Sequence, residues 1–378
     1  MRVLLVNPCL PDVFPHVGIA HLQGALLAAG IECMACDANR LPYIIKSRSF
    51  EFDVVGISVH SFAVKQALHC AKMCHYAWPH ARIVAGGHHA TAMPGQMLAG
   101  KFSDVISGQG EQKLVEMCGG HYAGYVPPVY AGLETTGGPV PFLGHCFPIV
   151  TSFGCPFSCS FCASSAFWGG KWTSLPAETV IREIEARRKS GEMDRWMFED
   201  DNFTADRYRA IEICEGIKAV APGVPWACAG RATDLTDSVL CMALKEAGCV
   251  RVWLGVESFS DRMLGLMHKG TTAARMKHGI AMAHAFDLPT FGQFIVGFPG
   301  ENEESIAETV AGIRLSALTN HGGNICWVLP GTKPHIEATA RGFKDRDYVT
   351  DGAPFYTFEH PIEKLTEWSK LIDGAHNG

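Results

Sequence analysis

The chain contains 378 residues, of which 47% are hydrophobic and 19% are charged, and its formal net charge is −6. This composition is that of a globular protein and excludes a disordered or fibrous one. A mildly acidic chain is a poor candidate for non-specific binding of nucleic acid, which depends on clustered Lys and Arg. No apolar run approaches the roughly 18–20 residues that cross a bilayer. The apolar start is interrupted by Pro8 and is too short for a secretory signal. We therefore expect a cytoplasmic protein that binds neither nucleic acid nor a membrane.

The first 120 residues alternate short apolar runs with stretches of helical periodicity. The expected strands are 2–7, 31–36, 53–58, 81–87 and 104–108, and the expected helices are 16–30, 61–78, 91–100 and 111–118. Alternation of this kind favours a parallel, doubly wound sheet with right-handed crossovers. Residues 1–120 are therefore predicted to form a Rossmann-like α/β domain.

Small and polar residues follow four of these strands. The four segments are Asn7–Cys9, Ser58–His60, Gly86–His89 and Gly108–Glu111. Any one of them is explained by a tight turn. Ligands of doubly wound sheets bind beyond the carboxyl ends of the strands, so the four together predict a binding edge.

A Gly- and Pro-rich linker at 121–146 separates this domain from a second series of strands and helices. The expected strands are 147–152, 195–200, 225–230, 250–257, 290–298 and 324–329, and the expected helices are 176–190, 204–219, 236–247, 272–286 and 303–317. A full eight-fold barrel needs roughly 250 residues. The segment 147–335 therefore predicts a partial (β/α)6 barrel, followed by a short tail at 336–378 with one helix at 361–373.

Cysteine is over-represented, with 15 in the chain. An odd number in a chain of this size does not indicate a disulfide framework. Most are expected to be small buried hydrophobic residues; these are Cys70, Cys74, Cys214, Cys228, Cys241 and Cys249. The exception is GCPFSCSFC, in which Cys155, Cys159 and Cys162 follow the first strand of the second domain. Structural zinc favours four ligands in two separated pairs, whereas three thiolates on a [4Fe–4S] cluster leave one iron open.

The CxxxCxxC spacing of Cys155, Cys159 and Cys162, on the loop after the first barrel strand, resembles the radical S-adenosylmethionine (SAM) superfamily. The resemblance implies that these cysteines hold a [4Fe–4S] cluster whose open iron binds SAM and cleaves it to a 5′-deoxyadenosyl radical. It also implies SAM-binding roles for four residues, which are Phe161, Glu199, Arg231 and Glu257. The segments 294–301 and 327–332 resemble the late barrel strands of the superfamily.

A doubly wound domain placed before such a barrel resembles the cobalamin-binding group of radical SAM enzymes. The resemblance implies that Ser58, Gly86 and Gly87 contact cobalamin. The DxHxxG motif that supplies a cobalt ligand in other cobalamin enzymes is absent, which leaves the lower face of the cobalt unassigned. A second reading places another iron–sulfur cluster on Cys9, Cys36 and His60, as in methylthiotransferases.

These observations predict a radical SAM enzyme that uses cobalamin to methylate an unactivated carbon or phosphorus of a small metabolite or natural-product intermediate. The resemblance implies an electron donor such as flavodoxin or ferredoxin. The alternatives are a radical rearrangement, cyclisation or sulfur insertion without methyl transfer, and a non-catalytic cobalamin or iron–sulfur sensor. Five histidines are expected to be structural or solvated; these are His16, His21, His88, His89 and His145.

Overall fold

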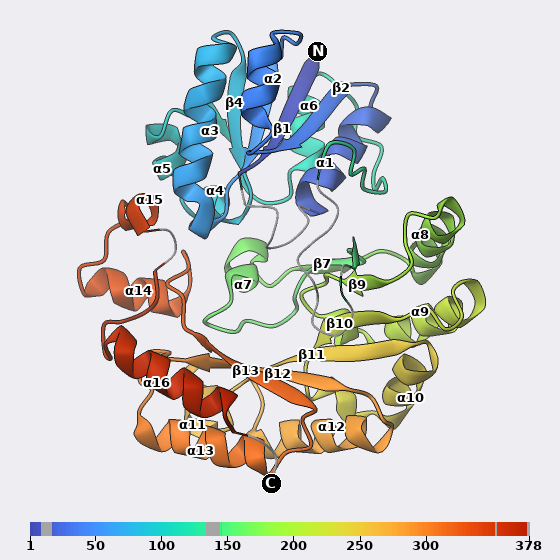
Figure 1. The fold of residues 1–378 in the computed structure, drawn as a ribbon, viewed down its shortest axis with the longest axis vertical. Helices are drawn as coiled ribbons and strands as arrows, with labels where there is room; N and C mark the ends of the chain where they lie inside the picture. The colour runs from blue at the N-terminus through green and yellow to red at the C-terminus, as the bar shows by residue number, and fades with distance from the viewer. Residues whose placement is uncertain (9–16, 134–143, 145, 352–353, 376–378) are drawn as a thin grey trace. The chain divides into compact units, whose positions relative to one another are not determined.

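The computed structural model describes residues 1–8, 17–133, 144, 146–351 and 354–375, and the chain divides into two compact units (Figure 1). The first unit comprises residues 1–145 together with 343–354, and the second comprises 146–342 together with 355–378. The segment anticipated as a linker thus groups with the first unit. Part of the tail, 343–354, also groups with the first unit although the sequence places it after the barrel.

The first unit contains a five-stranded parallel sheet in the order β2-β1-β3-β4-β5. The strands are β1 (Arg2–Asn7), β2 (Glu32–Asp37), β3 (Val54–Ser58), β4 (Arg82–Gly86) and β5 (Asp104–Val105). Residues Val3 to Val6 of β1 are at most 1% exposed, because helices cover both faces of the sheet. The predicted doubly wound fold is confirmed, and its order reverses between β1 and β3, where such sheets bind ligands.

The helices of the first unit follow from the right-handed crossovers of this sheet. They are α1 (Val17–Ala28), α2 (Leu41–Ser47), η1 (Ser61–Ala63), α3 (Val64–Ala77), α4 (His88–Ala92), α5 (Pro94–Ala99) and α6 (Glu111–Met117), with α15 (Asp347–Asp351) from the tail. Helix α1 packs on α6, and α2 packs on α3. The single helix expected at 91–100 is wrong. Met93 leaves the helical region (φ −128°, ψ 53°) because Pro94 restricts the residue before it, so a new helix starts at Pro94.

The second unit contains a six-stranded parallel sheet in the order β13-β12-β11-β10-β9-β6, which confirms the predicted partial barrel. The strands are β6 (Phe147–Ile149), β9 (Trp196–Phe198), β10 (Trp226–Gly230), β11 (Cys249–Glu257), β12 (Thr290–Val296) and β13 (Asn320–Ile325). The last strand was expected at 324–329 and begins earlier. Gly322 and Gly323 resemble a turn, but they pair with β12, and Ile372 of α16 (Ile362–Asp373) packs against Gly323.

Long helices lie outside this row of strands in Figure 1, and several begin at a side chain that caps free backbone N–H groups. The helices are α8 (Ala177–Ser190), α9 (Arg207–Val220), α10 (Ser238–Glu246), α12 (Ala273–Ala285) and α13 (Glu303–Arg314). Asp206, Asp237, Thr272 and Asn302 cap α9, α10, α12 and α13. Of all the helices in the described residues, none has both the length and the apolar character needed to span a bilayer.

Short elements at the strand ends were not expected from the sequence. They are the antiparallel pair β7 (Ser152–Gly154) and β8 (Trp172–Ser174), the helices α7 (Ala163–Trp168), α11 (Asp261–Leu266) and α14 (Lys333–Ala340), and the 3-10 turns η2 (Phe203–Ala205) and η3 (Asp234–Thr236). The strand expected at 147–152 therefore divides into β6 and the start of β7. These elements form the loops around the candidate site.

Replacing Gly279 with Ala tests the packing of α12 beneath these loops. A Cβ at this position would lie 1.8 Å from the carbonyl oxygen of Ala232, so the helix or the loop after β10 must move. We expect a loss of about 1–3 kcal/mol in the free energy of unfolding, measured by chemical denaturation. The matched control is Gly265→Ala in α11, where no atom lies within 4 Å of the new Cβ and stability should stay level or rise. Equal stabilities for the two variants would contradict this packing.

Candidate functional site

The loop that carries the three clustered cysteines starts from a backbone held by one buried carboxylate. Asp200, 3% exposed at the end of β9, accepts hydrogen bonds from Thr151 N (2.6 Å) and Oγ1 (2.5 Å) and from Ser152 N (3.2 Å) and Oγ (2.9 Å). Burial raises the pKa of Asp200, and the two Thr151 donors, the charge of Arg209 and the Ser152 hydroxyl oppose the rise. The carboxylate therefore joins the ends of two neighbouring strands.

Arg209 of α9 holds the same segment from another side. Its guanidinium donates to the carbonyl oxygen of Thr151 over 2.7 Å and to that of Leu175 over 2.9 Å, and the residue is 8% exposed. Burial lowers the pKa of Arg209 while the nearby Asp200 raises it. Two buried, opposite charges thus determine where the cysteine loop leaves the sheet.

Cys155, Cys159 and Cys162 lie between β7 and α7, with Cys159 8% exposed and the other two half-buried. Burial raises the pKa of Cys155 and Cys162, and the negative charge of Asp201 and of the neighbouring cysteines raises both further. Backbone N–H groups oppose this, from Phe157 at Cys155 and from Ser165 and Ser164 at Cys162.

This donor set fits an iron–sulfur cluster better than a single ion. Three thiolates that repel one another in a partly buried loop need a cationic centre between them, and iron supplies it. In the described part of the chain, no three His, Cys, Asp or Glu side chains are grouped so that they could hold one metal ion. A cluster does not require that convergence, because each thiolate binds its own iron.

Two further contacts hold the middle of the cysteine loop. Ser160 N donates to the carbonyl oxygen of Met267 over 2.9 Å, and the carbonyl oxygen of Ser160 accepts from Lys333 N at the start of α14 over 2.8 Å. The Ser160 hydroxyl also reaches the carbonyl oxygen of Leu266 (3.3 Å). The loop is therefore fixed against α11 and α14 as well as against the sheet.

Arg231, predicted to bind SAM, follows β10 and lies against the cysteine loop. Its guanidinium carbon is 3.9 Å from the centre of the Phe157 ring, and Nη1 donates to Cys159 Sγ over 3.7 Å. Nη2 donates to the carbonyl oxygen of Lys269. The side chain is 7% exposed, so the structure places a buried cation next to the cysteines.

Glu257 and Phe161, two more of the predicted SAM-binding residues, meet at Lys269. The ammonium of Lys269 donates to Glu257 Oε1 over 2.9 Å, with the two side chains 6% and 9% exposed, and it lies 5.6 Å from the centre of the Phe161 ring. Glu257 has a φ of +68°, and a Cβ on Gly255 would lie 2.6 Å from its carboxylate. Lys269 was not among the residues predicted from the sequence. Its only signal was a basic residue in MHKGTT, between a helix and a glycine.

Glu199, the fourth predicted SAM-binding residue, directly follows β9 and donates its backbone N–H to the carbonyl oxygen of Ile149 over 2.8 Å. Burial raises the pKa of Glu199 to about 7, and the negative charge of the adjacent Asp200 adds to the rise. The structure thus places Glu199 at the same sheet edge as the cysteine loop, as a carboxyl group that titrates near neutrality.

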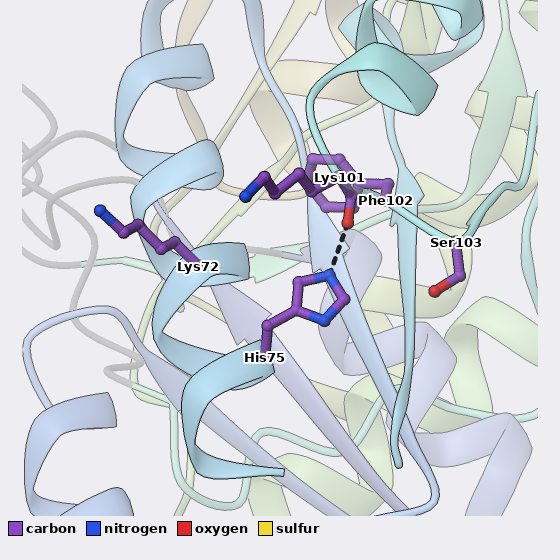
Figure 2. A pocket seen from close by; sticks show the side chains of 5 residues that line it. All are labelled: Lys72, His75, Lys101, Phe102 and Ser103. Carbon is purple, nitrogen blue, oxygen red and sulfur yellow. Dashed lines mark hydrogen bonds between the residues drawn. The ribbon is translucent and has the colours of Figure 1, made fainter. Parts of the chain in front are cut away.

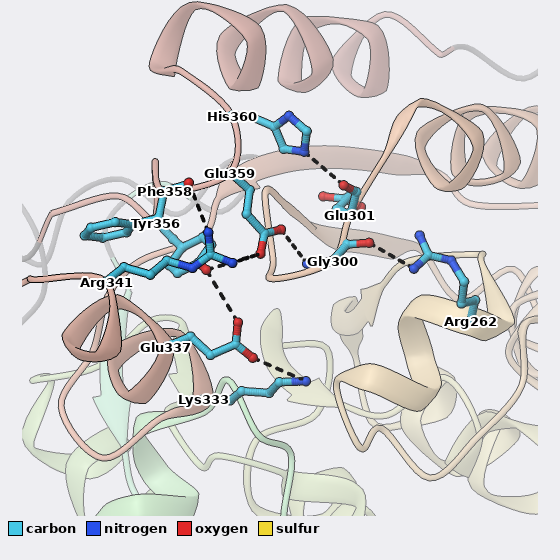
Figure 3. Close-up of polar contacts among 10 residues, drawn as sticks. All are labelled: Arg262, Gly300, Glu301, Lys333, Glu337, Arg341, Tyr356, Phe358, Glu359 and His360. Atoms are coloured by element: carbon cyan, nitrogen blue, oxygen red, sulfur yellow. Dashed lines mark hydrogen bonds and ion pairs between the residues drawn. The ribbon is translucent and has the colours of Figure 1, made fainter.

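The segment 294–301 ends in a turn that the tail of the chain holds in place, as Figure 3 shows. Gly300 N donates to Glu359 Oε2 (2.7 Å), and Arg262 donates to the carbonyl oxygen of Gly300 (2.9 Å). His360 donates to the carbonyl oxygen of Glu301 (2.9 Å), and burial raises the pKa of the Glu301 carboxyl to about 7. This carboxyl accepts from Gly297 N (2.5 Å), so it orders the turn.

In the first unit, Ser58, Gly86 and Gly87 lie together at the carboxyl ends of β3 and β4, as predicted, but the two glycines differ. Gly87 has a φ of +94°, and a Cβ there would lie 3.0 Å from Val59 O and 3.2 Å from Ser58 Oγ. At Gly86 the nearest atom to a Cβ is Ile106 O, at 3.9 Å. The protein itself therefore requires glycine at 87, whereas a Cβ at Gly86 would make only an ordinary van der Waals contact.

The histidines near this edge have different surroundings. His89 is 1% exposed and bonds to Ser61 Oγ (3.0 Å) and Gln96 Oε1 (2.6 Å), which is the structural role expected for it. The rings of His60 and His88 lie 5.7 Å apart, and His60 stacks on Phe62.

Among the other histidines expected to be structural or solvated, His21 is buried beside Tyr125. His16 and His145 lie outside the described residues.

The second-cluster reading on Cys9, Cys36 and His60 stays a prediction. Cys36 is 1% exposed in β2, and burial raises its pKa to about 12, with further contributions from Asp37 and Cys70. The ring of His60 lies near those of His88 and Phe62. Cys9, the third residue of that reading, lies outside the described residues.

The cysteines expected to be buried are confirmed as buried free thiols; they are Cys70, Cys74, Cys214, Cys228, Cys241 and Cys249.

A surface pocket in the first unit lies beside the end of α3 and the start of β5 (Figure 2). It is lined by Lys72, His75, Lys101, Phe102 and Ser103. His75 Nε2 donates to the carbonyl oxygen of Lys101 over 2.6 Å. This is the amino edge of the sheet, opposite the edge that carries Ser58 and Gly86, and no predicted site residue lies there.

Comparison with known proteins matches each unit to a family. Residues 149–312 match the radical SAM superfamily, and residues 3–117 match the B12 binding domain. An uncharacterised methyltransferase of Pyrococcus horikoshii is 29% identical, over 100% of this chain and 92% of its own. Anaerobic magnesium-protoporphyrin IX monomethyl ester cyclase of Rubrivivax gelatinosus is 26% identical, over 82% of this chain and 65% of its own. The radical SAM methyltransferase TsrM of Kitasatospora setae, solved with cobalamin and a [4Fe–4S] cluster, has a similar fold (TM-score 0.73, 18% identity, 90% of this chain and 75% of that one).

Replacing Glu199 with Gln tests the raised pKa at this edge. An acid whose pKa rises from 4.5 to about 7 on folding binds more protons in the folded state, so its contribution to stability falls as pH rises through that range. The free energy of unfolding of the cluster-free protein is measured from pH 4.5 to 7.5. Over this range it should fall less with rising pH in Glu199→Gln than in the wild type. Near neutral pH, the free energy of unfolding of Glu199→Gln should exceed that of the wild type by at most about 3 kcal/mol. Glu215→Gln, at a surface ion pair with Lys218, is the control and should keep the wild-type slope. If the free energy of unfolding of Glu199→Gln depends on pH as in the wild type, the raised pKa of Glu199 is contradicted.

Proposed function

The chain belongs to the radical SAM superfamily, in the group with an N-terminal B12 binding domain, and from this we propose that it is a cobalamin-dependent methyltransferase acting on an unactivated carbon or phosphorus of a small molecule. The observation that carries the proposal is the cysteine loop held by Asp200 and Arg209, with the cation of Arg231 against it. The similarity to a methyltransferase over the whole chain supports the transfer of a methyl group.

Cys155, Cys159 and Cys162 would hold a [4Fe–4S] cluster. When bound, the cluster supplies the electron that cleaves SAM to a 5′-deoxyadenosyl radical, and cobalamin carries the methyl group. Hydrogen bonds of Asp200 and Ser160 hold the loop in place. A loop with few alternative positions loses little entropy when it binds the cluster.

The residues around the loop suit the charged parts of SAM. Arg231 offers a buried cation for the carboxylate, and Glu199, titrating near neutrality, offers a carboxyl that the SAM ammonium would ionise. Glu257 offers acceptor oxygens for the ribose hydroxyls, and Phe161 offers an aromatic neighbour for the base. These side chains are half-buried or buried, so their interactions with a ligand are weakly screened by water.

Ser58 and Gly86 would contact cobalamin at the carboxyl edge of the first sheet. Among the described residues, only Ile106 O lies within 4 Å of the Cβ position of Gly86, which leaves room for the ligand to approach the backbone there, while Gly87 keeps the turn after β4 tight against Val59. A small electron carrier such as flavodoxin or ferredoxin is the proposed reductant. The net charge of −6 argues against a nucleic acid substrate.

A second candidate function is a radical cyclisation without methyl transfer. The similarity to a cyclase over 82% of this chain favours it. Both candidates use the same cysteine loop, and they differ in whether the methyl group of SAM is consumed.

Replacing Gly86 with Val tests the cobalamin contact. The new side chain would extend from the end of β4 into the space proposed for the ligand, so we expect binding of hydroxocobalamin, followed by absorbance, to weaken about tenfold or more. The unfolding midpoint of the ligand-free protein should change little. Gly95→Ala in α5, where no atom lies within 4 Å of the new Cβ, is the control and should bind like the wild type. If Gly86→Val binds hydroxocobalamin with wild-type affinity, the proposed contact at the end of β4 is contradicted.

The ratio of SAM products separates the two candidate functions. A methyltransferase of this kind uses SAM in two roles, so turnover should yield S-adenosylhomocysteine and 5′-deoxyadenosine in about equal amounts. A cyclase should yield 5′-deoxyadenosine alone. Chromatography of anaerobic reactions measures both products. The variant with Cys155, Cys159 and Cys162 all changed to Ala should lose the iron and form no deoxyadenosine. Deoxyadenosine formation by that variant would contradict the role of the loop.

A further inference from the structure

Lys269 touches three of the four side chains assigned to the SAM site, although it belongs to none of the segments that suggested the site. Its ammonium donates to Glu257 (2.9 Å) and lies 5.6 Å from the centre of the Phe161 ring. Its backbone carbonyl accepts from Arg231. One residue therefore links the end of β11, the cysteine loop and the loop after β10.

The surrounding backbone is shaped to admit the ion pair between Lys269 and Glu257. The sheet register between β11 and β12 shifts between Gly255 and Glu257, and Glu257 takes a left-handed conformation (φ +68°) that is costly for a residue with a side chain. A Cβ on Gly255 would lie 2.6 Å from the carboxylate and 3.0 Å from the ammonium. Strain of this kind persists where the structure around it holds it in place, and it clusters at functional sites.

Stability alone does not account for this pair. Both side chains are more than 90% buried, and removing two charges from water offsets most of their attraction. A pair of apolar residues in the same space is often equally stable or more so. The pair therefore points to a need for the Glu257 side chain to be held in this position.

We propose that Lys269 is a positioning residue for the nucleoside half of SAM, in that its ammonium holds the Glu257 carboxylate oriented to accept hydrogen bonds from the ribose hydroxyls. This inference rests on the proposed function. The ammonium occupies Oε1, and a carboxylate has further lone pairs on both oxygens with which to accept hydroxyl groups. Through its carbonyl, the same residue sets the position of Arg231 beside Cys159.

The experiment compares ligand binding by the cluster-reconstituted chain in four forms: wild type, Lys269→Met, Glu257→Gln, and the two changes combined. The probes are SAM, 5′-deoxyadenosine as the nucleoside half, and methionine as the amino acid half, each measured by equilibrium dialysis. Lys269→Arg is the conservative variant. Lys218→Met, which breaks an exposed pair with Glu246, is the matched control and should match the wild type throughout.

We expect Lys269→Met to bind SAM and 5′-deoxyadenosine about 10- to 100-fold more weakly, with methionine affinity and iron content unchanged. Lys269→Arg should recover most of the loss, because it retains a cation beside Glu257. If Lys269 acts through Glu257, adding Lys269→Met to Glu257→Gln should weaken nucleoside binding no further. The combined variant has no unpaired buried charge, so it keeps the test valid should either single variant fold poorly.

Three results would overturn the inference. They are wild-type nucleoside affinity in Lys269→Met, a loss that falls on methionine instead, and a further loss when Lys269→Met is added to Glu257→Gln. Failure of the proposed function has a different signature, since the wild-type chain would then bind no iron or would not cleave SAM.

Discussion

The hydrogen bonds between Asp200 and the Thr151–Ser152 backbone are the constraint on which the rest of the site depends. The three cysteines of the loop would repel one another as thiolates, so the geometry of the loop comes from its anchors. Asp200 binds both amides and both hydroxyls, and Arg209 binds the carbonyl oxygen between them. Because both anchors are buried, water competes poorly for these bonds, and breaking one leaves an unpaired charge.

Charge burial is the common feature of the groups around that loop. Arg231 lies on Phe157 and beside Cys159, Lys269 pairs with Glu257, and Glu199 has a pKa raised to about 7. Each group loses solvation on folding, which costs stability. The cost is consistent with a site that recognises a zwitterionic, charged ligand, because the same low dielectric strengthens every interaction with it.

The first unit uses the backbone itself more than charged side chains. Gly87 adopts a left-handed conformation that keeps the turn after β4 against Val59, so the fold itself requires glycine at this position. Gly86 is not among the glycines with a positive φ, and a Cβ there would make only an ordinary van der Waals contact, so packing within the protein does not require glycine at this position. Two adjacent glycines that look alike in the sequence are thus separated by their surroundings.

The parallel α/β architecture of both units and the cysteine loop could be predicted from the sequence, because strand and helix periodicity and the spacing of Cys155, Cys159 and Cys162 are local features of the chain. Three of the four residues assigned to SAM were also expected at strand ends; they are Glu199, Arg231 and Glu257. The contacts that join these residues follow from the tertiary structure. Lys269 contacts Arg231, 38 residues away, and Asp200 contacts Thr151, 49 residues away. Such pairs depend on the order and register of strands, which is set by packing over the whole sheet and has no local signal in the chain.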